Sequence, residues 1–132
     1  MSWKGTWRNQ YGSTVTITQE ENGEVRGIFR TALLDSAFYG QEAPILGLCR
    51  GDLITFAASG RGSAGDVVVS YTGMLRDSHM ETVWSFIADG TLTATGEGAP
   101  ASISKTNWWR AVVTNVDTFE RVDGPAVENG RD

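Results

Sequence analysis

Apolar and polar side chains alternate along residues 13–18 of this chain. Ser13, Val15 and Ile17 fall on one side of the segment, and the threonines at 14, 16 and 18 fall on the other. A period of two residues is typical of a β-strand with one buried face. The same period recurs further along, and no segment has a convincing helical pattern. We therefore expect an all-β protein.

Turn-forming residues divide the chain into about eight short strands, and Asn22-Gly23 is a strong hairpin signal. After an opening strand near residue 5, the expected strands are 13–18, 25–32, 45–49, 53–58, 67–75, 80–88 and 108–122. We expect loops at 35–43 and 89–107. Such strands form a sandwich or a closed barrel, and an eight-stranded up-and-down barrel has room for one small ligand. Residues 1–122 are predicted to form one domain, and 123–132 a flexible C-terminal tail.

Composition excludes several classes of function. The net charge is −5 and the 11 Lys and Arg residues are scattered, which argues against a nucleic-acid partner. No apolar run approaches the ~20 residues of a transmembrane helix, so we expect no membrane partner. One cysteine, Cys49, and one histidine, His79, predict no disulfide, metal site or cofactor. Because no apolar leader is visible, we expect a cytoplasmic protein or a secreted one whose signal was removed.

Four motifs resemble those of the avidin/streptavidin family, in a bacterial-type and divergent form. Residues 5–14 read GTWRNQYGST, residues 23–29 read GEVRGIF, and residues 82–84 read TVW. Trp109 is followed eight residues later by Asp117-Thr118-Phe119. The resemblance extends over residues 3–122. It implies an eight-stranded antiparallel up-and-down β-barrel that binds biotin, catalyses nothing and assembles into a homo-oligomer, either a dimer or a tetramer.

The resemblance also implies a cluster that recognises a cyclic urea. Asn9 and Ser13 match the groups that donate to the ureido oxygen, and Asp117 and Thr31 match the acceptors of the two ureido N–H groups. An amide, a hydroxyl and two acceptors complement a urea, which offers one acceptor and two donors.

Aromatic walls are the second implied feature of the site. Trp84 and Trp109 match two of them, and in tetrameric members the second reaches into a neighbouring subunit's pocket. Tyr71 stands where relatives have Trp or Phe. One further wall has two alternatives, because either Gly60 or Phe56 replaces a tryptophan. The other residues expected to contact the ligand are Leu33, Phe86 and Val113.

Three departures from the family pattern predict a weakened biotin site. Phe29 stands where the family has a tyrosine that donates to the ureido oxygen, and Val67 and Val69 replace a serine and a threonine. We expect weaker biotin binding, or a biotin-like cyclic urea or amide with a more apolar tail. An alternative is an enzyme that templates the cyclisation of an apolar substrate, with Asp117 as base. Another is a barrel filled by its own side chains.

Overall fold

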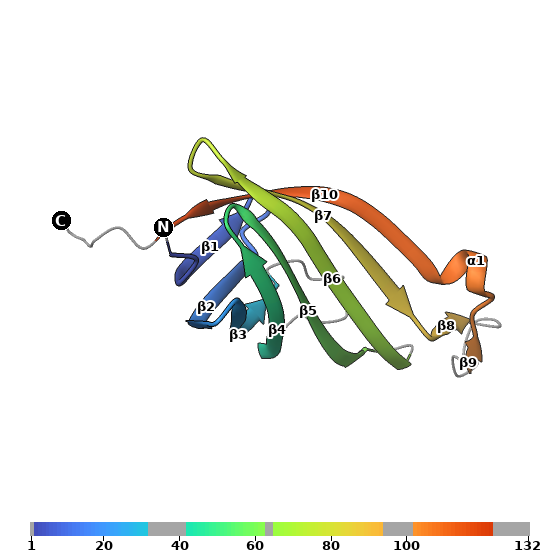
Figure 1. Cartoon of the computed structure of the whole chain (residues 1–132). Helices are drawn as coiled ribbons and strands as arrows, with labels where there is room; N and C mark the ends of the chain where they lie inside the picture. The colour runs from blue at the N-terminus through green and yellow to red at the C-terminus, as the bar shows by residue number, and fades with distance from the viewer. Residues whose placement is uncertain (1, 32–41, 63–64, 94–101, 123–132) are drawn as a thin grey trace.

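The computed structural model describes residues 2–31, 42–62, 65–93 and 102–122. Most of them are in strands, as the alternation predicts (Figure 1). The strands are β1 (Gly5–Asn9), β2 (Thr14–Glu21), β3 (Glu24–Arg30), β4 (Glu42–Arg50), β5 (Leu53–Gly62), β6 (Gly65–Arg76), β7 (His79–Ala88), β8 (Gly90–Thr93), β9 (Ser102–Lys105) and β10 (Val112–Arg121). One helical turn, α1 (Trp108–Ala111), precedes the last strand.

Eight of these strands close into an antiparallel barrel in the order β1-β10-β7-β6-β5-β4-β3-β2. Chain neighbours lie side by side except where the β8–β9 hairpin is inserted between β7 and β10. The expected eight-stranded up-and-down barrel is therefore confirmed. The Asn22-Gly23 turn also forms as predicted, with both residues at positive φ, 54° and 78°.

Alternation along each strand separates a buried inner face from an outer one. On β2, Val15 and Ile17 are fully buried while Thr14 and Thr16 are half-exposed. The inner side chains form one core cluster, which joins strands from every part of the barrel. Several side chains on the outer face are apolar and exposed, among them Leu46, Leu48 and Val68.

Two tryptophans from the N-terminal segment seal one end of the barrel. Trp3 and Trp7 are each 1% exposed, and Trp7 Nε1 donates to the Trp3 carbonyl oxygen at 2.9 Å. The Arg121 guanidinium lies 4.3 Å from the centroid of the Trp7 ring and donates to the carbonyl oxygens of Ser2 and Lys4. These contacts fasten both ends of the described chain to the same end of the barrel (Figure 1).

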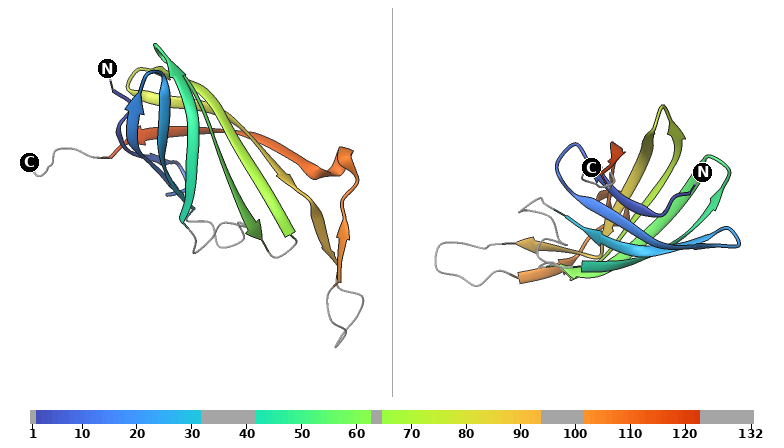
Figure 2. Two further views of the ribbon diagram at one scale, coloured as in Figure 1. Left: turned by 60° about the horizontal axis from the view of Figure 1, so that its bottom comes forward. Right: turned by 90° about the vertical axis from the view of Figure 1, so that its left-hand side faces the viewer.

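The opposite end differs from the prediction. Residues 89–107 do not run as one loop, because β8 and β9 pair with each other as a separate hairpin. The segment 108–111 is helical, so the last strand begins at Val112 and not at Trp108. Figure 2 shows this hairpin and α1 beyond the ends of β6 and β7. Among the described residues, no helix has the length and apolar character needed to cross a bilayer.

Candidate ligand-binding site

Asn9 is the last residue of β1, and its side chain is buried. Its Oδ1 accepts the backbone N–H of Ser13 at 2.9 Å, as expected for an Asn that caps its own turn. That contact fixes which way the amide faces, so Nδ2 points at Asp117 and donates to Oδ2 at 3.0 Å. One Nδ2 hydrogen remains for another acceptor, because an amide nitrogen carries two.

Asp117 lies on β10 and is 5% exposed. Its Oδ2 accepts from Asn9, and its Oδ1 accepts from Gln10 Nε2 at 3.3 Å. Thr82 Oγ1 donates to its main-chain carbonyl at 2.9 Å, which ties β10 to β7 at the same level. A carboxylate has about four lone-pair positions, so this fixed group retains capacity for a further donor.

Ser13 and Thr31 extend the polar cluster across β2 to the end of β3. Their hydroxyl oxygens are 3.1 Å apart, and both residues are buried. Ser13 is also joined to Asn9 through its backbone N–H. The four residues expected to recognise a urea are thus linked in one hydrogen-bonded row, Asp117–Asn9–Ser13–Thr31, which we call the polar floor.

An aromatic cluster packs beside the polar floor. Tyr71 stacks on Phe56 with ring centroids 5.1 Å apart, and its centroid lies 6.0 Å from that of Phe29. Phe119 meets Tyr71 edge-on at 5.7 Å. Burial, and to a lesser extent the charge of Asp117, raises the pKa of Tyr71. The phenol therefore remains neutral near pH 7.

The inner faces of β6 and β7 line the space beyond this cluster with apolar side chains. Val67 and Val69 are buried and pair with Ala88 and Phe86 across the two strands. Trp84 and Phe86 share the inner face of β7 yet are only half-buried. Side chains therefore do not close over the interior at this level, in contrast to the packed cluster of Phe29, Phe56 and Tyr71.

Two residues expected to contact the ligand are exposed in this chain, and a third lies outside the described residues. Trp109 lies in α1 and is 71% exposed in this single chain. Val113 shares the inner side of β10 with Asp117, because it pairs with Phe86, but it is 53% exposed. Leu33 lies outside the described residues. Gly60 pairs with Val67, four residues along β5 from Phe56, which pairs with Tyr71.

Gln10 is a site residue that sequence reasoning missed. It donates to Asp117 Oδ1, and its own Oε1 accepts the backbone N–H of Thr118 at 3.1 Å. Strand alternation assigns Gln10 to the face opposite Asn9, but the chain turns at Gln10 and brings both amides to one carboxylate. No group of three or more His, Cys, Asp or Glu residues suited to a metal ion occurs in the described part of the chain.

Comparisons with known proteins agree with this architecture. The model of the Avidin family matches residues 1–122. The structure of a rhizavidin–biotin complex is 23% identical, with a TM-score of 0.68, and covers 98% of each chain. A bradavidin2–biotin complex is 19% identical with a TM-score of 0.68, over 92% of this chain and 99% of that one. Apo short afifavidin is 22% identical with a TM-score of 0.65, over 92% and 96%.

Proposed function

Since this chain belongs to the avidin family, we propose that its barrel binds biotin or a biotin-like molecule with a cyclic urea or amide head. The observation that supports this proposal is the polar floor, in which Asn9 and Asp117 are fixed side by side on the inner face. Structures similar to this one include biotin complexes of rhizavidin and bradavidin2.

The polar floor is complementary to a urea in the number and type of its groups. Asn9 Nδ2 and the Ser13 hydroxyl donate to the carbonyl oxygen of the ligand. Asp117 and the Thr31 hydroxyl accept from its two N–H groups. Because Asn9 and Asp117 are already held by Ser13 and Gln10, little side-chain entropy is lost when the ligand binds.

We propose that biotin itself binds less tightly than the family's best ligands. Phe29 offers no hydroxyl, and Val67 and Val69 offer nothing to a polar tail. A missing donor costs about 1–3 kcal/mol, a missing tryptophan wall about 3–5 kcal/mol, and neighbouring losses are not additive. With the lost tail contacts included, the total loss is about 4–10 kcal/mol. From the ceiling near −18 kcal/mol, about −14 to −8 kcal/mol remains, which corresponds to a dissociation constant between about 0.1 nM and about 1 μM.

The same apolar residues determine which kind of ligand tail the barrel favours. Val67 and Val69 are buried apolar side chains, so a charged carboxylate beside them loses its hydration without gaining a partner. A neutral, apolar tail avoids this cost. The preferred ligand therefore carries the cyclic head of biotin on a less polar tail.

Calorimetry on the full chain tests this proposal. Biotin, its methyl ester and desthiobiotin are titrated separately, and we expect micromolar or tighter binding with the ester at least as tight as the acid. Absence of detectable heat with all three at millimolar concentration would overturn the proposal. That result would leave the cyclisation template or a different ligand as the alternatives.

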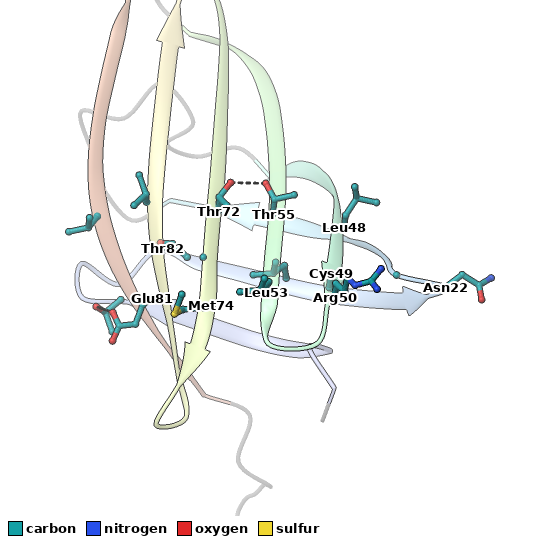
Figure 3. A pocket seen from close by; sticks show the side chains of 16 residues that line it. Asn22, Leu48, Cys49, Arg50, Leu53, Thr55, Thr72, Met74, Glu81 and Thr82 are labelled. Carbon is teal, nitrogen blue, oxygen red and sulfur yellow. Dashed lines mark hydrogen bonds between the residues drawn. The ribbon is translucent and has the colours of Figure 1, made fainter.

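We also propose that the chain assembles with copies of itself through the outer face of the barrel. A groove on this face is lined by exposed apolar side chains from β4, β5, β6, β7 and β10, here called the outer groove: Leu48, Leu53, Met74, Val83 and Val116. Figure 3 shows Leu53 and Met74 near its middle, with Arg50 and Glu81 toward opposite sides. Exposed apolar patches of this kind mark interfaces.

A two-fold axis through the outer groove gives a self-complementary contact. In a two-fold contact, if one residue of the first copy touches a second residue of the other copy, the reverse contact also forms. Arg50 of each copy then faces Glu81 of the other. Exposed Trp109 at the far end of the barrel offers a second contact. Native mass spectrometry with and without biotin tests the proposal, since it reports assembly and occupancy together. A monomer at micromolar concentration would contradict it.

A further inference from the structure

Tyr71 is the one buried tyrosine among the described residues, and it lies in the barrel interior. On β6 it pairs with Phe56 of β5 and with Trp84 of β7, so its ring stands on the inner face between two other aromatic residues. The side chain is 5% exposed. Stacking on Phe56 and the edge contact with Phe119 hold the ring in one orientation.

The hydroxyl of Tyr71 makes no hydrogen bond within the described part of the chain. Directly across the strand pair, the buried Nε1 of Trp84 also lacks an acceptor among the described residues. Buried donors without partners are uncommon in native proteins, because each has lost its hydration without compensation. The buried Nε1 of Trp84, beside the Tyr71 hydroxyl on the same inner face, indicates that an acceptor is supplied by something other than these parts of the chain.

The environment of Tyr71 keeps its phenol protonated, so the hydroxyl can donate a hydrogen bond. Asp117 is near enough for its charge to act on Tyr71, and burial acts in the same direction, so the proton is retained. Both carboxylate oxygens of Asp117 already accept amide protons, from Asn9 and from Gln10. No hydrogen bond joins the Tyr71 hydroxyl to either oxygen of Asp117 in the described part of the chain, so the phenolic proton is available to a ligand beside it.

Building on the function proposed above, we propose that Tyr71 Oη donates a hydrogen bond to the carbonyl oxygen of the cyclic urea or amide. The ring of Phe29, which lies 6.0 Å away on the other side of the interior, carries no hydroxyl. The donor that the Phe29 wall lacks is then provided from the opposite wall. This assignment makes Tyr71 a residue that selects for a carbonyl-containing head group.

The test separates a donor from a packing residue by measuring two quantities on Tyr71→Phe. If the hydroxyl serves only the ligand, its removal weakens biotin binding about tenfold or more. The same change leaves the melting temperature of the ligand-free protein unchanged or raises it, because this hydroxyl makes no hydrogen bond to the described part of the protein that its removal would break. Tyr11→Phe removes the same group from a side chain that is 57% exposed and serves as the matched control.

The other possible results distinguish failure of the Tyr71 role from failure of the proposed function. Binding of biotin to Tyr71→Phe within twofold of the original protein overturns the role of Tyr71 while leaving the proposed function intact. If Tyr71→Phe loses both affinity and thermal stability, the double variant Phe29→Tyr with Tyr71→Phe decides. Regained affinity without regained stability supports the donor role, and no regained affinity overturns it. Failure of the unaltered protein to bind biotin or desthiobiotin overturns the proposed function itself.

Discussion

Asn9 Nδ2 donates to Asp117 Oδ2 at 3.0 Å although 108 residues separate the two in the chain. The contact exists because β1 and β10 are neighbours in the closed barrel, with Asn9 paired to Phe119. Closure of the sheet is therefore what assembles the polar floor. A hydrogen bond between buried partners, one of them a carboxylate, is also stronger than an exposed one.

Replacing Asp117 by Asn should weaken ligand binding far more than it alters the barrel. The amide presents one acceptor where the carboxylate presents two, so the N–H groups of Asn9, Gln10 and the ligand compete for it. We expect a loss of about 2–3 kcal/mol in binding free energy, or about 30- to 150-fold, measured by calorimetry with biotin. Asp52→Asn is the matched control because Asp52 is exposed and its 3.9 Å pair with Arg76 contributes little.

The seal at the closed end should contribute measurably to stability. Trp7→Phe removes the hydrogen bond to the Trp3 carbonyl and reduces the contact with Arg121. Together these losses should lower the free energy of unfolding by about 2–4 kcal/mol, seen as a lower midpoint in urea. Trp108→Phe, at a residue that is 71% exposed, should change it by less than about 0.5 kcal/mol. Equal midpoints for the two variants would contradict this account of the seal.

Charge placed in the outer groove should prevent assembly without affecting the polar floor. Leu53→Glu introduces a carboxylate into the middle of an apolar contact, where two copies would repel each other. We expect sedimentation velocity to show a smaller species, with biotin still bound. Ile28→Glu tests the same change on the outer face of β3, outside the groove, and should leave the sedimentation coefficient as it was.

Stability should fall in alkaline solution because Tyr71 resists ionisation in the folded state. Its pKa is raised above the ordinary value of 10.0, so the unfolded chain releases this proton first. The contribution is therefore fully present below pH 10 and is lost as pH rises above it. Between pH 10 and 11 we expect the free energy of unfolding to fall less steeply in Tyr71→Phe, by up to about 1.4 kcal/mol per pH unit. Parallel pH profiles would contradict the prediction.

The barrel could be predicted from sequence because its strands repeat one simple period. The β8–β9 hairpin and α1 at its far end could not be predicted. β8 and β9 have four residues each, and they pair only with each other. Segments this short carry too few alternations to be distinguished from a loop. The single turn of α1 is likewise too short for a helical period to appear.

The residues of the polar floor were predicted by resemblance to a family. Strand alternation alone accounts for only some of the residues at this site. Ser13 follows from the period of β2, since it shares the inner face with Val15 and Ile17. Gln10 does not follow from any period, because it lies in the turn between β1 and β2. Trp109 is exposed in a single chain, and its expected role depends on a neighbouring copy.

A crystal structure of the protein grown with saturating biotin tests the central claim most directly. We predict the cyclic urea above the polar floor, its carbonyl oxygen within hydrogen-bond distance of Asn9 Nδ2 and one N–H directed at Asp117. Biotin found with its ring away from both residues, or an interior without biotin at saturation, would contradict the account.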